Sequence, residues 1–340
     1  MAGNAGKWKN LLFLGVIMMS TTDAANKPLQ IRSVFNINSA FCAIKTNGVL
    51  GMDNRDSALA GRGFGTSSTN AMLVLANGEN EISLEIGALG WFSEAKLSDE
   101  DRKKFSPGAG CKLELTAFKG MESKVLSRIE VGINSSGIPV VRPDEERVST
   151  TPQDVTVRKI VAPQTEKGHL PDDYVIKNYY PDGMALYQFT RKVYLRGLPD
   201  WKWVKATPFT GTPEQVQALK RAYLDLWQLF ASKKSSAVRS YLNESLQAWS
   251  LTTGDSVDEI YNDRNFVQNF KNPGFEMIPI NWADYQLEVM NNGRMVRFVN
   301  KSVLSVSPIS YYIALDNGWK RLMYYSPVYS LINGRFVPVI

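Results

Sequence analysis

Apolar and polar residues alternate in short runs along the first third of the chain. In the clearest run, Ile82, Leu84 and Ile86 share one face of a predicted strand, and polar residues occupy the other face. Similar runs cover residues 30–50, 111–115 and 126–133. Short strands at close spacing, without a convincing helix between them, predict an antiparallel β-sandwich.

Turn residues separate these runs. Asn47-Gly48 and Asn77-Gly78 each stand between apolar runs, and this dipeptide is a strong hairpin signal. Between residues 137 and 173, five prolines indicate an extended connector with additional strands, one of them near 155–161.

Helical periodicity begins at Thr212. Thr212-Pro213-Glu214 combines a capping residue, a proline at the first helical position and an acid in the first turn. The apolar spacing then predicts three helices, over 212–230, 236–249 and 256–270. Strands follow to the end of the chain, with hairpin turns at 291–293, 316–318 and 333–334.

These elements predict an α+β protein: an N-terminal antiparallel β-sandwich followed by an α+β domain with helices packed on a curved antiparallel sheet. The expected divisions are 1–24 (signal peptide), 25–136 (sandwich), 137–211 (connector with additional strands) and 212–340 (α+β domain). The order of elements in the last division resembles the cone-like fold of the nuclear transport factor 2-like superfamily. That resemblance implies a curved sheet that can hold a small molecule at its mouth.

The chain opens with the features of a cleavable signal peptide. Lys7 and Lys9 precede an unbroken apolar run over 11–19, and Ala24-Ala25 follow. The run is shorter than the ~20 apolar residues that a membrane-spanning helix needs. We expect cleavage after Ala24 or Ala25 and a periplasmic mature protein, with an uncleaved anchor or a buried strand as the alternatives.

The net charge of the chain limits the classes of partner that we expect. Residues 1–24 contain two lysines and one aspartate, so their removal lowers the formal net charge from +6 to +5. The charges are spread along the chain without a block of like charges, so no nucleic acid partner is expected and membrane contact would be at most peripheral. A mildly positive surface favours an acidic protein partner or anionic lipid head groups.

The two cysteines, Cys42 and Cys111, both lie in strand-like runs of the first half. In an oxidising compartment, two cysteines in one domain predict a disulfide, and two buried free thiols are the alternative.

The catalytic inventory is small. His169 is the only histidine, so motifs that need two histidines are excluded, and no cofactor or metal is expected. His169 lies in a polar loop beside Asp172 and Asp173, and an exposed loop histidine is the ordinary interpretation. The glycines of GRGFGTSST, residues 61–69, are spaced too closely for a dinucleotide fingerprint and lack a βαβ context.

Paired carboxylates remain a possible catalytic set, because two acids can hydrolyse a glycoside without a histidine. The candidates are Glu79, Glu81 and Glu85 in one run, and Asp284 with Glu288 in another. Nothing in the sequence marks any pair as buried.

Two aromatic groups are candidates for contact with a partner. Trp201, Lys202, Trp203 and Lys205 form a tryptophan–lysine stretch that we predict to be partner-binding, since exposed Trp and Tyr often anchor protein interfaces. The alternative is a core or interdomain position. The second group consists of Tyr311, Tyr312, Trp319, Tyr324, Tyr325 and Tyr329, for which the core is the favoured interpretation.

We therefore expect a protein-binding module rather than an enzyme. The signal peptide, the strands NGENEISLEIG and CKLEL, and the lack of a catalytic set resemble periplasmic immunity proteins that guard against type VI secretion effectors, particularly lipases. This resemblance implies a toxin as the protein partner, inhibited by occlusion of its active site. A carbohydrate- or lipid-binding envelope protein and a carboxylate-dependent hydrolase are the alternatives.

Overall fold

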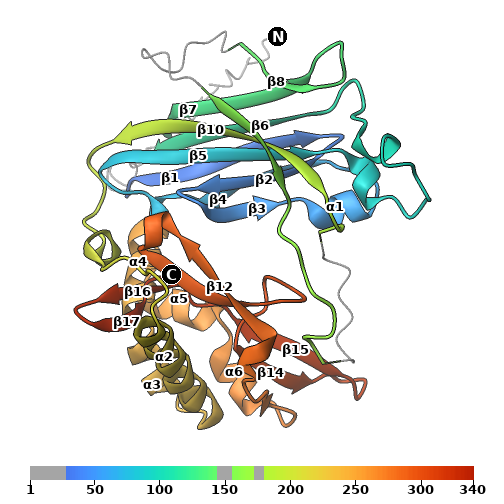
Figure 1. The fold of residues 1–340 in the computed structure, drawn as a ribbon. Coiled ribbons are helices and arrows are strands. Elements are labelled where there is room, and N and C mark those ends of the chain that lie inside the picture. The colour runs from blue at the N-terminus through green and yellow to red at the C-terminus, as the bar shows by residue number, and fades with distance from the viewer. Residues whose placement is uncertain (1–27, 144–154, 172–179) are drawn as a thin grey trace, which may run out of the picture.

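The computed structural model describes residues 28–143, 155–171 and 180–340. A strand-rich region lies above a region of helices and strands (Figure 1). The chain is therefore a mixed α+β protein with a strand-rich N-terminal part, as the sequence predicts. The expected signal peptide, residues 1–24, lies outside the described residues.

Two five-stranded antiparallel sheets form the upper region. The first contains, in spatial order, β4 (Gly65–Asn70), β1 (Gln30–Asn38), β6 (Gly110–Lys119), β7 (Glu122–Ile133) and β8 (Pro139–Val141). The second contains β3 (Val49–Asp53), β2 (Phe41–Thr46), β5 (Gly78–Gly87), β10 (Ala185–Leu195) and β9 (Thr156–Val161). A short helix, α1 (Arg55–Leu59), follows β3.

The alternation of apolar and polar residues gives each sheet an apolar face, and the two sheets pack together through these faces. Ile82, Leu84 and Ile86 of β5 are completely buried in the core that the sheets share. Cys42 of β2 and Cys111 of β6 form a disulfide that ties the second sheet to the first, with their Cα atoms 6.6 Å apart. The sandwich core and the disulfide are thus both confirmed.

The sandwich extends further along the chain than the sequence predicts. Strands β8, β9 and β10 all lie beyond residue 136, within the expected connector, and complete the two sheets. Phe189 of β10 pairs with Leu84 of β5, so the inward-facing row of β5 continues onto β10. The additional strands expected after residue 137 therefore belong to the sandwich.

Between β9 and β10 the chain leaves the sandwich and reaches the lower region. We call residues 162–171 the strap, which runs down the right-hand side of Figure 1. The backbone N–H of Glu166 donates to the carbonyl of Lys301 at 2.8 Å. Leu170 packs against a small apolar cluster around Val303. The strap is therefore a second connection between the two regions, besides the chain that follows β10.

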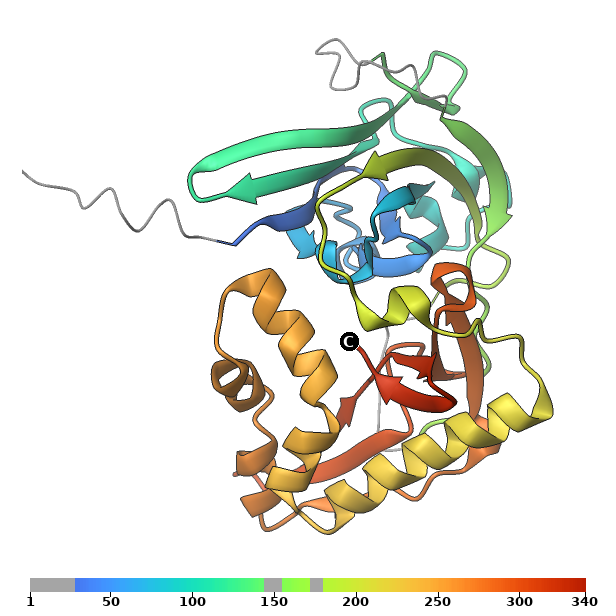
Figure 2. The same cartoon turned by 90° about the vertical axis from the view of Figure 1, so that its left-hand side faces the viewer.

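Helices and two antiparallel sheets form the lower region (Figure 2). The helices are α2 (Pro213–Ala231), α3 (Ser235–Tyr241), α4 (Asn243–Thr253), α5 (Val257–Asp263) and α6 (Phe266–Lys271). One sheet contains β11 (Glu276–Met277), β14 (Ile309–Ala314) and β15 (Lys320–Tyr325). The other contains β12 (Tyr285–Met290), β13 (Met295–Asn300), β16 (Tyr329–Ile332) and β17 (Arg335–Pro338).

Three features of this region differ from expectation. The helices expected over 236–249 and 256–270 are each broken, at Leu242 and at Asn265. Asn265 adopts a left-handed conformation with φ 57°, which a continuous helix cannot accommodate. The strands fall into two sheets rather than one curved sheet. The side chain of Asn300 accepts bonds from the N–H groups of Ser302 and Val303, which turns the chain between β13 and β14.

Four of the five predicted hairpin turns are confirmed. They join β2 to β3, β12 to β13, β14 to β15 and β16 to β17. The prediction of a hairpin at Asn77-Gly78 is wrong, because residues Met72–Val74 form a short 3₁₀ helix instead of its first strand. All three of these side chains are buried in the core that both regions share. Their burial there outweighs the strand propensity of the segment.

The two regions share that core. Met290, Met295, Val328 and Val339 of the lower region belong to the same buried cluster as the sandwich interior. None of the helices in the described ranges is long and apolar enough to cross a membrane.

Candidate functional site

The tryptophan–lysine stretch lies in the interface between the two regions. Residues Lys202–Lys205 form a 3₁₀ turn, and the side chains of Trp201 and Trp203 are only 6% and 2% exposed. Their indole N–H groups donate to the carbonyls of Leu75 at 2.9 Å and Leu73 at 3.1 Å. The prediction that these tryptophans are exposed partner anchors is therefore wrong, because their rings fill the shared core.

The two lysines of the stretch remain at the surface. Lys202 forms an ion pair with Glu244 of α4, and Lys205 is exposed. An exposed ion pair of this kind contributes little to stability, about 0–1 kcal/mol.

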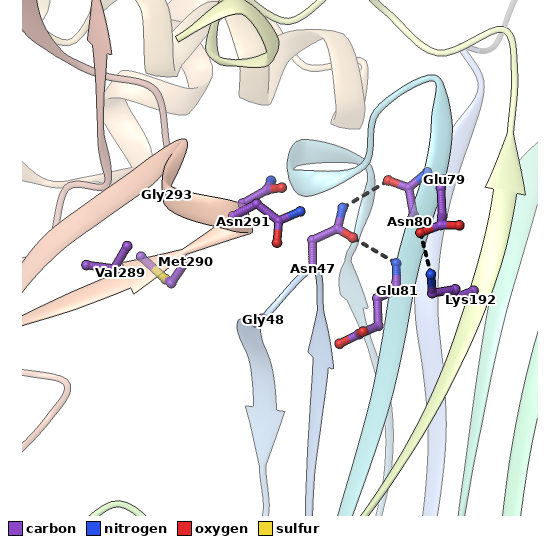
Figure 3. Close-up of a pocket in the computed structure, with 11 residues that line it drawn as sticks. Asn47, Gly48, Glu79, Asn80, Glu81, Lys192, Val289, Met290, Asn291 and Gly293 are labelled. Atoms are coloured by element: carbon purple, nitrogen blue, oxygen red, sulfur yellow. Dashed lines mark hydrogen bonds and ion pairs between the residues drawn. The ribbon is translucent and has the colours of Figure 1, made fainter. Parts of the chain in front are cut away.

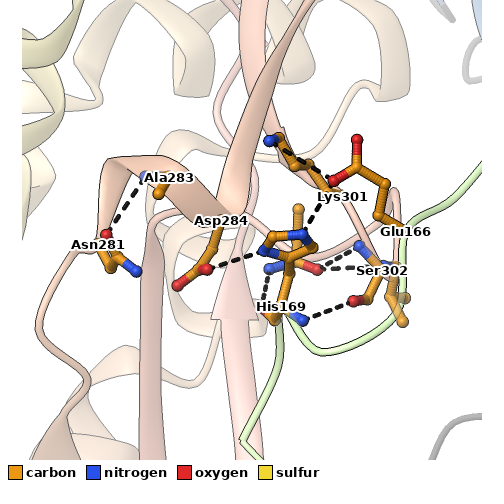
Figure 4. A network of polar contacts seen from close by, with 9 residues as sticks. Glu166, His169, Asn281, Ala283, Asp284, Lys301 and Ser302 are labelled. Carbon is orange, nitrogen blue, oxygen red and sulfur yellow. Dashed lines mark hydrogen bonds and ion pairs between the residues drawn. The ribbon is translucent and has the colours of Figure 1, made fainter.

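His169 binds the strap to the lower region (Figure 4). Its Nδ1 lies 2.9 Å from a carboxylate oxygen of Asp284, and its Nε2 lies 3.0 Å from one of Glu166. Its backbone N–H donates to the hydroxyl of Ser302 at 2.9 Å, and its carbonyl accepts from the Asn300 side chain. Both ring nitrogens therefore face carboxylates. The contact with Asp284 fixes the strap against the lower region.

The histidine site differs from the sequence interpretation in two respects. The His169 side chain is only 21% exposed, so it is partly buried rather than an exposed loop residue. Its carboxylate neighbours come from Asp284, 115 residues away, and from Glu166. Asp172 and Asp173, which the sequence places beside it, lie outside the described residues.

Three of the five candidate carboxylates, Glu79, Glu85 and Glu288, pair with a lysine or an arginine. Asp284 binds His169, and Glu81 accepts from the Ser83 hydroxyl. Glu79 binds Lys192 at 2.8 Å, and Glu288 binds Arg297. Glu85 is almost completely buried, and its Oε1 accepts from Lys45 at 2.6 Å and from Gln188. Within the described ranges, no group of three or more histidine, cysteine or acidic side chains could hold a metal ion.

A polar cleft of about 530 Å³ lies where the turn after β2 meets the turn after β12 (Figure 3). Asn47 lies in its wall and binds both the Asn80 side chain, at 2.9 Å, and the backbone N–H of Glu81, at 2.8 Å. The backbone N–H of Asn291 donates to the Asn47 carbonyl at 2.9 Å. The first two bonds fix Asn47 within the sandwich, and the third joins it to the lower region, so these polar groups of the cleft serve the interface.

The tip of the β14–β15 hairpin presents large apolar side chains to solvent. We define the tip as residues 315–319. The Trp319 side chain is 72% exposed and that of Leu315 is 37% exposed. By contrast, Tyr311, Tyr325 and Tyr329 are buried in the core of the lower region, as the sequence predicts. The same prediction is wrong for Tyr324, which is 38% exposed.

Short-range bonds hold the tip in one shape. The N–H of Leu315 donates to the carbonyl of Trp319 at 2.7 Å, and the N–H of Trp319 donates to the Asn317 side chain at 3.1 Å. Gly318 has φ 80°, a left-handed conformation that a side chain would strain. The side chain of Asn272 binds both the N–H and the carbonyl of Ala314, at 2.8 and 3.0 Å.

A basic edge continues from the tip into β15. Lys320 pairs with Glu276 at 2.8 Å and lies over the ring of Tyr312. Arg321 is exposed, and no carboxylate of the described residues lies within ion-pair distance of it. The sequence groups Trp319 with the strand tyrosines. Its position directly after the turn glycine is the signal that separates it from them, because such a residue lies at the hairpin end.

In comparisons with known proteins, no family, no curated protein and no solved structure matches this chain. The resemblances drawn from the order of its elements therefore stay predictions.

Proposed function

We propose that the mature chain is a periplasmic protein-binding module that inhibits a secreted antibacterial effector, a lipase or a similar enzyme. In this proposal the β14–β15 tip enters the active-site cleft of the effector and occludes it. The observation that carries the proposal is the exposure of Trp319 and Leu315 on a braced hairpin. A cleft that binds lipid chains is apolar, and these two side chains match it.

The energetics of the tip favour this use. Trp and Arg are enriched among the few residues that dominate protein interfaces. The bonds around Leu315, Asn317 and Ala314 fix the tip before binding, which lowers the entropy that an interface has to overcome. Arg321, next to the tip, favours an acidic rim on the partner.

Three further observations support a binding role. The only imidazole, that of His169, lies between Glu166 of the strap itself and Asp284 of the lower region, where it fixes the strap. The candidate carboxylates Glu79 and Glu288 are each paired with a cation. The disulfide suits an oxidising compartment outside the cytoplasm.

The test is to pass the secreted proteins of its own organism over the immobilised mature chain and to assay the retained fraction for phospholipid hydrolysis. The same capture is made with Trp319→Ala. Tyr194→Ala is the matched control, because Tyr194 is an exposed aromatic (62%) on the sandwich, away from the tip. We expect one stoichiometric enzyme that the wild-type chain inhibits.

Loss of Trp319 should weaken that complex by about 2 kcal/mol or more, roughly 30-fold in Kd, while Tyr194→Ala leaves it unchanged. Equal inhibition by Trp319→Ala and the wild type would remove the tip from the contact. Capture of no enzyme would overturn the proposed function as a whole.

A further inference from the structure

A second and larger cleft lies where the sandwich, the strap and the lower region meet. Its volume is about 740 Å³, within the range of small-molecule sites in proteins. Trp91 and Arg102 come from the sandwich, Lys167 from the strap and Ser302 from the lower region. Ligand clefts occur preferentially at such junctions between domains.

The aromatic wall of this cleft is held in place. Gly90 lies against the backbone of Arg102, where an added Cβ would be only 2.8 Å from the Arg102 Cα atom. The Arg102 guanidinium then lies 5.6 Å from the Trp91 ring centroid. Phe92 is buried and packs against Phe41, with the ring centroids 5.4 Å apart. The indole of Trp91 is therefore fixed by its neighbours. It is partly exposed, with the Arg102 guanidinium lying over its ring.

The polar side chains of the cleft are mixed in charge, without an excess of cations. Arg102 and Lys167 supply cationic donors, and Glu94, Glu166 and Asp182 supply anionic acceptors. The Ser302 hydroxyl accepts from the His169 N–H, which leaves its own hydrogen free to donate. The cleft thus lacks the excess of cations that a phosphate or nucleotide requires. Its mixture of donors and acceptors suits a neutral ligand with many hydroxyl groups.

We propose that this cleft binds a neutral oligosaccharide. The part of the Trp91 indole that Arg102 leaves uncovered provides an apolar surface on which the C–H face of a sugar ring packs. The charged side chains around it hydrogen-bond the hydroxyl groups at the ring edge. No residue of the β14–β15 tip lines this cleft, so the site extends the proposed function and does not depend on it.

The test is saturation-transfer NMR and calorimetry on the mature, disulfide-bonded chain with two probes, chitotetraose and maltotetraose. We expect saturable binding of at least one probe, with micromolar to millimolar Kd. Trp91→Ala should weaken it at least tenfold. Lys167→Ala, a change to an exposed strap residue that should leave the fold intact, should weaken it severalfold.

Trp319→Ala is the matched control and should bind the sugar as the wild type does, because the tip is not part of the cleft. Binding that Trp91→Ala and Lys167→Ala leave unchanged would overturn the proposal. So would the absence of binding to both probes. Neither result bears on inhibition of an effector through Trp319, so the two proposals fail separately.

Discussion

Trp201 donates its indole N–H to the carbonyl of Leu75 across 2.9 Å, although 126 residues separate them in the chain. Leu75 is completely buried, so this carbonyl has no access to water. We predict that Trp201→Phe destabilises the protein by about 2 kcal/mol, because it leaves a buried acceptor unpaired and removes part of the ring. Urea unfolding of the two proteins measures this difference.

Trp319→Phe is the control for that measurement. Trp319 is 72% exposed, so the same change there should alter the free energy of unfolding by less than about 0.5 kcal/mol. Equal effects at the two positions would show that the Trp201–Leu75 bond contributes nothing to the interface.

Substitutions of Asn47 can separate the energetic cost of backbone strain from the cost of losing side-chain hydrogen bonds. Its φ is 50°, and its side chain binds Asn80, the Glu81 N–H and the carbonyl of Val74. Asn47→Gly keeps the conformation accessible and removes the bonds, at a cost of about 1–3 kcal/mol. Asn47→Ala should cost about 1 kcal/mol more, since alanine resists this conformation. Denaturant unfolding that ranks alanine above glycine in stability would contradict this account.

The disulfide should contribute substantially to stability. Cys42 and Cys111 are separated by 69 positions, and in the chain-entropy model closure of such a loop contributes about 4 kcal/mol. We therefore expect the Cys42→Ala/Cys111→Ala variant to unfold at lower denaturant than the oxidised protein. Adding reductant should lower the midpoint of the wild type and leave that of the variant unchanged. A wild-type midpoint that reductant does not shift, although thiol titration shows the bond to be reduced, would refute the prediction.

Local patterns in the sequence were sufficient to predict most elements. The alternation in β5, the cap at Thr212 and the turn at Asn333-Gly334 each depend on neighbours within a few residues. Those predictions hold because strand pleat, helix capping and turn geometry are short-range effects. The strand predicted around Met72–Val74 is wrong, because contacts with residues far along the chain decide the conformation of this segment.

The site could be predicted only in part, for the same reason. The pairing of His169 with Asp284 spans 115 residues and depends on the path of the strap, which no local pattern encodes. The burial of Trp201 and Trp203 likewise depends on where the lower region packs against the sandwich. A pair of tryptophans separated by one lysine reads equally well as an exposed anchor or as interface core. Only the tertiary arrangement decides between the two.

Two tyrosines of the lower region should make stability depend on pH at the alkaline end. Burial raises the pKa of Tyr241 to about 12, and burial together with the nearby Asp284 charge raises that of Tyr285 to about 12. In the unfolded chain a tyrosine ionises near pH 10. Below that pH both states keep the proton, and this contribution to stability is fully present. Between about pH 10 and 12 only the unfolded chain loses the proton, so stability falls as pH rises.

We therefore expect the Tyr241→Phe/Tyr285→Phe variant to lose less stability than the wild type when the pH rises from about 9 to 11. The variant lacks the hydroxyl bonds to the carbonyls of Ala222 and Ser307, so it should be weaker than the wild type near pH 8. The change in unfolding free energy with pH, rather than its value at one pH, is therefore the quantity to compare. Parallel pH profiles for the two proteins would mean that the pKa values of these two hydroxyl groups do not change on unfolding.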